Sequence, residues 1–339
     1  MNKKEPSLFP LISKYRSELM GFAALWILFF HKWVCLFTDF PVIGLVEEIV
    51  KNFGYVGVDI FFFLSGTGLC YAIEKYSVGK FYARRFARIL FPYIVVTAIV
   101  GILHRLSFVE ILKNASGWSF VAESIFSVQW FVPAIAIFYL LFPLYYLVFS
   151  KAKNPILFTI AVIEIWVIVS IKLDGVMRSD LFGITNRIPV FLAGVGLGQF
   201  CKKKEIVCDR SFKFGMFATL VLGAYLCFLT NFRNMYLLVP ISNVAVPAML
   251  LACALAFFIP YILGFTEKCK PVGTVLRFYG SFSLELYLVS EPLGDIVIPR
   301  LYDLMPHLIV NILFLIMVTA VSYLLHLLNT LVVKCFIKD

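Results

Sequence analysis

Long apolar stretches separated by short polar segments occupy the chain from about residue 18 onward. A helix needs about 20 apolar residues to cross the hydrocarbon core of a bilayer. Stretches of roughly this length lie near residues 18–37, 55–74, 87–104, 128–149, 155–171, 187–201, 214–230, 236–264, 279–298 and 307–333. The stretch at 236–264 is long enough to tilt, or to break at Pro240 or Pro247. The pattern predicts an all-α integral membrane protein with about ten transmembrane helices.

Lysine and arginine are concentrated in every second connection between these stretches. The connections that are rich in them hold 21 of the 30 basic residues, namely Lys3, Lys4, Lys14, Arg16, Lys75, Lys80, Arg84, Arg85, Arg88, Lys151, Lys153, Lys202, Lys203, Lys204, Arg210, Lys213, Lys268, Lys270, Arg277, Lys334 and Lys338. Because cytoplasmic loops carry an excess of lysine and arginine, both termini are predicted to be cytoplasmic. We expect a cytoplasmic segment at 1–17, one ten-helix membrane domain at 18–333 and a short cytoplasmic tail at 334–339.

Composition supports this class and argues against others. Of the 339 residues, 61% are hydrophobic and 15% are charged, whereas soluble domains carry roughly 25% charged residues. The net charge of +10 would suggest a nucleic-acid partner, but the alternation of basic connections explains it by membrane topology. The eight cysteines are scattered without a Cys-x-x-Cys pair, so neither a metal site nor a disulfide framework has much support. No cleavable signal stands out, since the first 17 residues are polar and the following apolar run continues to about residue 37.

Few ionisable side chains fall within the predicted spans, and each is a functional candidate because a charge in lipid is costly. The candidates are His31, Lys32, Asp59, Glu164, Arg187, Glu285, Glu291 and His326, together with Glu123 shortly before the span at 128–149. His31 lies two-thirds along the first span among apolar residues, and imidazole suits general-base catalysis near neutral pH. A histidine that hydrogen-bonds a neighbouring helix is the alternative interpretation.

Two further candidates, Asp59 and His326, have structural interpretations. Asp59 either orients a histidine on an adjacent helix or caps its own helix behind Gly54 and Gly57, and the local sequence favours capping. His326 has no polar neighbour along the sequence and is interpreted as structural packing.

Three arginines gather at the start of the third predicted span. Arg84 and Arg88 are four residues apart and share a helix face, with Arg85 beside them. Guanidinium groups near a helix N-terminus suit phosphate oxygens. Anchoring against anionic lipid headgroups explains the cluster equally simply, and it is favoured when the cluster is considered alone.

Six segments, in order along the chain, resemble the membrane-bound acyltransferase 3 family. They are Leu28–His31, Gly57–Gly66, Phe81–Arg88 with Pro92–Tyr93, Gln129–Leu144, Arg187–Gly194 and Gly280–Leu288. The resemblance covers the chain from about residue 10 to residue 335. Family members transfer acyl groups, most often acetyl, to sugars of bacterial surface polysaccharides and related glycans, and their core has ten spans. The resemblance therefore implies this fold and this activity.

The resemblance also implies roles for individual residues. It makes His31 the catalytic histidine and Asp59 the membrane aspartate of the family. Arg85 and Arg88 become the paired arginines of the third helix, and Arg187 the arginine before the later Pro-Phe-Leu-Gly pattern.

Two positions depart from the family pattern. The family usually has an arginine eleven residues before its histidine, where this chain has Met20; Arg16, about 60° round the helix and another turn away, is a possible substitute. Many members have histidine before the proline of the late helix, where this chain has Ser290-Glu291-Pro292. Either Glu291 takes a polar role, or the acyl or acceptor specificity differs, or the chain is an inactive relative.

The reaction implied is acyl transfer, acetyl first among candidates, from cytoplasmic acyl-CoA to a hydroxyl of a glycan or its lipid-linked precursor. Arg84, Arg85 and Arg88 would hold the donor's phosphates. His31 would take the hydroxyl proton or form a transient acyl-imidazole. Its tautomer would be set by Asp59 or Glu285, while Trp130 would stack on a sugar ring, and substrate contacts are expected at Arg16, Arg187 and Glu291.

We expect a multi-pass protein of the bacterial plasma membrane. Its partners would be membrane lipids, acyl-CoA as co-substrate and the glycan acceptor, with no permanently bound cofactor, no metal and no nucleic acid. A transporter or flippase of a lipid-linked sugar is one alternative, although no paired broken-helix repeats are evident. An inactive relative that acts in polysaccharide assembly is the other.

Overall fold

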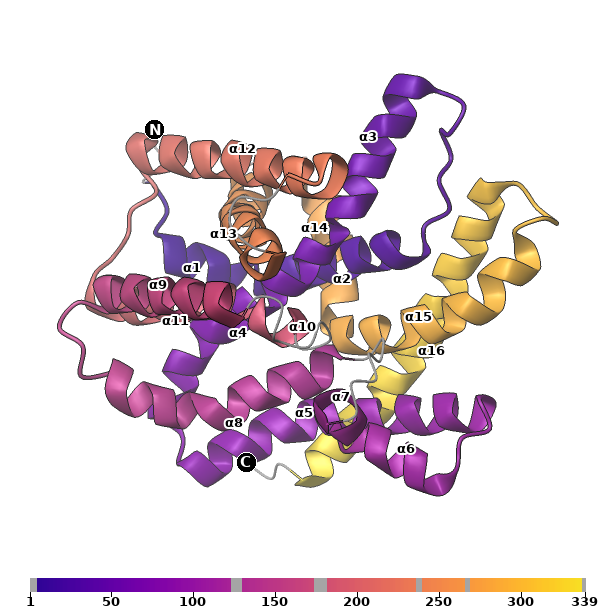
Figure 1. Ribbon diagram of the computed structural model, residues 1–339, viewed down its shortest axis with the longest axis horizontal. Coiled ribbons are helices and arrows are strands. Elements are labelled where there is room, and N and C mark those ends of the chain that lie inside the picture. The colour runs from indigo at the N-terminus through magenta and orange to yellow at the C-terminus, as the bar shows by residue number, and fades with distance from the viewer. Residues whose placement is uncertain (1–4, 123–129, 174–181, 236–239, 266–268, 337–339) are drawn as a thin grey trace. The chain divides into compact units, whose positions relative to one another are not determined.

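In a computed structural model, every regular element is helical, which confirms the all-α prediction (Figure 1). The structure describes residues 5–122, 130–173, 182–235, 240–265 and 269–336. Within these ranges there is no strand.

Within the described residues, seven helical segments are long and apolar enough to cross a membrane. They are Pro41–Lys75, Val78–Leu103, Phe131–Phe149, Pro155–Lys172, Arg210–Arg233, Val244–Phe265 and His307–Cys335. The three other predicted spans coincide with helices that are short or acidic: α2 (Arg16–Lys32) has 17 residues, α11 (Ile188–Lys203) has 16, and α15 (Ser283–Leu301) carries Glu285, Glu291 and Asp295. The multi-pass class therefore stands, while the count of ten and the cytoplasmic termini stay predictions.

The chain groups into two compact units. The first is formed by Met1–Ala23, Val56–Ser77 and Leu141–Ser281, and the second by Ala24–Tyr55, Val78–Leu140 and Phe282–Asp339. The chain crosses between them inside α2 and inside α8 (Phe131–Phe149). The domain bounds expected from the sequence stay a prediction.

The first unit is centred on α4 (Val56–Lys75), whose residues from Val56 to Leu64 are all buried. The other helices in it are α1 (Leu8–Lys14), the first part of α2, the last part of α8, α9 (Pro155–Leu173), α10 (Phe182–Thr185), α11, α12 (Arg210–Arg233), α13 (Pro240–Phe265) and α14 (Lys270–Ser281). Helix α11 packs against α4 and α9, and α12 packs against α13. Helix α13 begins at Pro240 and continues through Pro247, so Pro247 does not break it.

Glycines bring the backbones of α4 and α11 together. A Cβ atom at Gly194 would lie 2.2 Å from the Phe63 carbonyl oxygen, and one at Gly66 would lie 2.4 Å from the Phe191 carbonyl oxygen. The contact is thus reciprocal, with each helix offering a glycine to the backbone of the other. Small residues allow this approach in membranes, where van der Waals packing between helices replaces the hydrophobic effect as a source of association.

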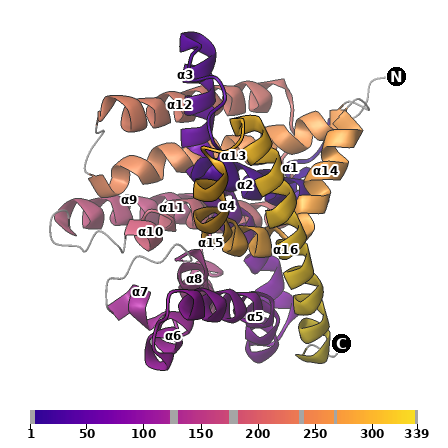
Figure 2. The same cartoon turned by 90° about the vertical axis from the view of Figure 1, so that its right-hand side faces the viewer.

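The second unit is built around the neighbouring helices α15, α16 (His307–Phe336) and α5 (Val78–Leu103), each of which packs against the other two. Figure 2 shows the long α16 running beside α15 and on to α5. The end of α2, α3 (Pro41–Asn52), the 3₁₀ turn η1 (Phe53–Tyr55), α6 (Phe108–Ala115), α7 (Trp118–Ala122) and the start of α8 complete it.

We predict that Gly194→Ala lowers the thermal midpoint of the detergent-purified protein, because the added methyl meets the backbone of α4 at a distance that no real Cβ tolerates. Gly215→Ala on α12 is the control, since no atom lies within 4 Å of its Cβ position and alanine favours a helix over glycine by about 1 kcal/mol. Scanning fluorimetry of both variants measures the difference, and equal midpoints would contradict the close α4–α11 contact.

Candidate functional site

His31 lies one residue before the end of α2 and faces an acidic side chain of α15. Its Nδ1 atom is 3.8 Å from Oε2 of Glu291, and 32% of the histidine side chain is exposed. The carboxylate that faces His31 within the second unit is therefore Glu291. Glu285 pairs elsewhere, as described below, so the expectation that it sets the histidine tautomer finds no contact to support it.

A second acid–base contact joins the same two helices next to His31. Lys32 Nζ lies 2.6 Å from Oδ1 of Asp295, which is four residues after Glu291 and so on the same face of α15. Gly294 makes room for the lysine stem, because a Cβ there would lie 2.5 Å from Lys32 Cδ. The two contacts fix how the end of α2 lies on α15.

Asn311 of α16 binds the backbone just after α2 with both ends of its side-chain amide. The Val34 N–H donates to Asn311 Oδ1 at 3.0 Å, and Asn311 Nδ2 donates to the Val34 carbonyl oxygen at 2.8 Å. One residue later, His307 Nδ1 lies 3.0 Å from the Cys35 carbonyl oxygen. These contacts satisfy backbone groups just beyond the end of α2, and they hold the segment that follows His31.

Glu47 of α3 holds the same segment from the other side. Its carboxylate accepts the backbone N–H groups of Leu36 and Phe37 and the Trp33 indole N–H, at 2.8 to 3.0 Å. Neither Glu47 nor Asn311 was identified from the sequence, because nothing along the chain connects these positions to the end of α2.

The three candidate donor-binding arginines lie in the first half of α5, also in the second unit. The Arg85 guanidinium lies 5.9 Å from the ring centroids of both Phe81 and Tyr139, a cation–π arrangement. Arg84 is half-buried, whereas Arg88 is exposed. Arg85 is therefore held against aromatic rings, whereas Arg88 is open to the surroundings of the helix.

Glu285 is buried at the start of α15 and binds two side chains of α16. Its Oε1 atom lies 3.2 Å from His326 Nδ1 and accepts a hydrogen bond from Asn329 Nδ2 at 2.8 Å. His326, interpreted from the sequence as structural packing, thus has a polar partner that lies 41 residues away in the sequence.

Asp59 and Arg187 form a buried ion pair in the first unit. Arg187 Nε lies 3.3 Å from Asp59 Oδ1, and the two residues are 6% and 0% exposed respectively. Neither carboxylate oxygen accepts a hydrogen bond from the described part of the chain, so the interpretation of Asp59 as a helix cap is wrong. Arg187 stands at the N-cap of α11, so the pair joins the starts of α4 and α11.

The remaining candidates lie at other points of the fold. Arg16 is the first residue of α2, and its Nη1 donates to the Leu64 carbonyl oxygen at 2.8 Å within the first unit. Trp130 is half-buried immediately before α8. Glu123 and Gln129 lie outside the described residues.

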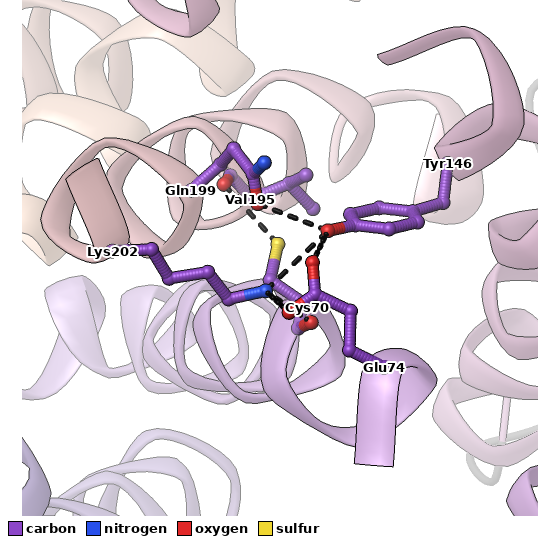
Figure 3. Close-up of polar contacts among 6 residues, drawn as sticks. All are labelled: Cys70, Glu74, Tyr146, Val195, Gln199 and Lys202. Atoms are coloured by element: carbon purple, nitrogen blue, oxygen red, sulfur yellow. Dashed lines mark hydrogen bonds and ion pairs between the residues drawn. The ribbon is translucent and has the colours of Figure 1, made fainter. Parts of the chain in front are cut away.

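A polar cluster that was not predicted from the sequence joins α4, α8 and α11 (Figure 3). Lys202 Nζ lies 2.7 Å from Glu74 Oε2 and donates to the Cys70 carbonyl oxygen at 2.7 Å. The Tyr146 hydroxyl bonds to Glu74 and lies 3.0 Å from Gln199 Oε1. Lys202, expected only to mark a cytoplasmic loop, therefore also fastens three helix ends together.

Comparison with known proteins identifies one family. A family model described as an acyltransferase domain matches residues 19–327. No curated protein and no solved structure gives a match.

We predict that Lys202→Met lowers the thermal midpoint, with a loss of about 1–3 kcal/mol, because it removes a charge that three groups of the cluster share. Lys204→Met is the matched control, since Lys204 lies two residues away and is exposed. Thermal unfolding of both variants in the same detergent measures the effect. An unchanged midpoint for Lys202→Met would show that the cluster does not fasten the helices.

Proposed function

This chain belongs to the membrane acyltransferase 3 family, and on that premise we propose that it is an O-acyltransferase. The donor is acyl-CoA, with acetyl-CoA the first candidate, and the acceptor is a hydroxyl of a bacterial cell-surface polysaccharide or of its lipid-linked precursor. The observation that carries this proposal is the approach of His31 to Glu291 on the same compact unit that holds Arg84, Arg85 and Arg88.

His31 supplies the general base. Its imidazole takes the proton of the acceptor hydroxyl while the oxygen attacks the thioester carbonyl; the new C–O bond forms, the C–S bond breaks, and the proton ends on the CoA thiolate. The Glu291 carboxylate at 3.8 Å stabilises the imidazolium that forms on the way. A transient acyl-imidazole on His31 achieves the same net transfer in two steps.

The arginines of α5 supply the donor site. Guanidinium groups match phosphate oxygens in shape and charge, and Arg88 extends outward whereas Arg85 is steadied by two aromatic rings. With ten spans and cytoplasmic termini in the bacterial plasma membrane, these arginines face the cytoplasm and His31 lies toward the outer half. The acyl group then moves across the bilayer as it is transferred.

The proposed acceptor contacts of the second unit are Trp130 and Glu291. Trp130 supplies a flat surface for a sugar ring, and Glu291 accepts a sugar hydroxyl when it is not paired with His31. Arg16, Arg187 and Asp59 belong to the first unit, where Arg16 binds the Leu64 carbonyl of α4 and Arg187 pairs with Asp59, and the roles expected for them from the sequence stay predictions.

We predict that His31→Ala lowers acetyl transfer at least 100-fold, because general-base catalysis contributes about 10²–10⁴ in rate. The control is His104→Ala, whose histidine is exposed just after α5. Glu291→Gln should also lower kcat, and Asp295→Asn should do so less. Transfer is followed with labelled acetyl-CoA and purified protein. Full activity of a well-folded His31→Ala variant would rule out the proposed role, and export of a lipid-linked sugar without transfer would favour a flippase.

We also predict that Arg85→Ala/Arg88→Ala loses saturable acetyl-CoA binding. Lys151→Ala/Lys153→Ala removes the same charge from an exposed cytoplasmic connection and should bind as the unaltered protein does. Calorimetry in detergent measures both affinities. Equal losses in the two double variants would indicate nonspecific attraction of an anion. Absence of binding by the unaltered, folded protein would indicate another donor or a chain without this activity.

A further inference from the structure

The arginine-bearing turn of α5 lacks one of its own helix hydrogen bonds. Pro92 lies inside α5, and proline has no N–H to donate to the carbonyl four residues earlier. That carbonyl belongs to Arg88. The Arg88 carbonyl oxygen therefore needs a hydrogen-bond donor from outside α5.

Asn329 of α16 provides the replacement. Its Nδ2 atom lies 3.3 Å from the Arg88 carbonyl oxygen and 2.8 Å from Glu285 Oε1. An amide NH₂ carries two hydrogens, one for each of these acceptors. Asn329 is only 7% exposed, and its Oδ1 has no hydrogen-bond partner in the described chain. The opposite orientation of the amide would turn this oxygen toward two acceptors, so the acceptors themselves determine which way the side chain lies.

Glu285 in turn is held in place by His326. The carboxylate is 3% exposed and receives both His326 Nδ1 and Asn329 Nδ2 on one oxygen. The four residues Arg88, Glu285, His326 and Asn329 thus connect α5, α15 and α16 within the second unit.

We propose that Asn329, oriented by Glu285 and His326, is a positioning residue for the arginine-bearing turn of α5 and so for binding of the acyl-CoA donor. This inference rests on the proposed function, in which Arg85 and Arg88 contact the donor's phosphates. Loss of the Asn329 amide leaves the Arg88 carbonyl without a donor, and the turn that carries both guanidinium groups shifts to satisfy it.

The same helix offers a matched control. Asn311 lies 18 residues earlier on α16, is 4% exposed, and also binds backbone groups with its side-chain amide. Its partner is Val34, three residues after His31. The two asparagines therefore make the same kind of contact, one beside the arginines and the other beside the histidine.

The experiment compares Asn329→Leu with Asn311→Leu in the full-length, detergent-purified protein. Asn329→Leu is expected to weaken acetyl-CoA affinity at least tenfold while kcat at saturating donor stays within about twofold. Asn311→Leu is expected to lower kcat and leave the donor affinity unchanged. Equal changes in the two variants, or an unchanged donor affinity in Asn329→Leu, overturn the proposal.

A double variant separates positioning from loss of general stability. Pro92→Ala returns the backbone N–H that the Arg88 carbonyl lacks, so Pro92→Ala/Asn329→Leu should recover most of the donor affinity. No recovery overturns the assignment. Hydrogen exchange across residues 84–93 tests the contact without any donor and should be faster in Asn329→Leu alone. If the unaltered protein does not bind acetyl-CoA, the proposed function fails, whereas unchanged exchange in Asn329→Leu refutes the positioning contact itself.

Discussion

Backbone groups at helix ends and interruptions have no water to bind inside a membrane, and side chains that take its place connect the elements of this structure. Asn311 binds both the N–H and the carbonyl oxygen of Val34 after α2, and Asn329 binds the Arg88 carbonyl that Pro92 leaves without a donor. In the first unit, Arg16 and Lys202 donate to carbonyl oxygens near the middle and the end of α4. Each contact satisfies one backbone group and, by doing so, fixes the helix that carries it against another.

Charged side chains obey the same constraint, because a charge without a partner is costly in a low-dielectric interior. Asp59 is held by Arg187, Glu285 by His326 and Asn329, and Glu18 by Arg277 at 2.6 Å. His31 and Glu291 lie further apart than these pairs, at 3.8 Å. Because its contact with the carboxylate is longer than those of the other pairs, the His31 imidazole is the group best able to exchange a proton with a substrate.

The second unit accordingly contains both the proposed base and the proposed donor-binding arginines. The imidazole of His31 meets Glu291 of α15, while the arginines of α5 are tied to α15 and α16 through Asn329 and Glu285. Helix α15 therefore faces the proposed base, while α16 binds the backbone just after that base and the backbone of Arg88 at the proposed donor site. An acyl transfer needs these two places to be held in a constant relation, and two adjacent helices provide that relation with few residues.

The sequence by itself determined the helical membrane class, because this follows from the composition and length of single apolar runs. The resemblance of six ordered segments indicated the family, which the family model confirms, and the site residues named from it stay predictions. Hydrophobic runs predict spans whatever lies beside them, and His31 or Asp59 is conspicuous against its own apolar neighbours. The partners were decided only by the tertiary structure. The carboxylate that faces His31 is Glu291, the partner of Asp59 is Arg187, and His326 is paired rather than isolated. These contacts join residues 41 to 260 positions apart, and side chains at such separations meet only when packing brings their helices together, which no local pattern encodes.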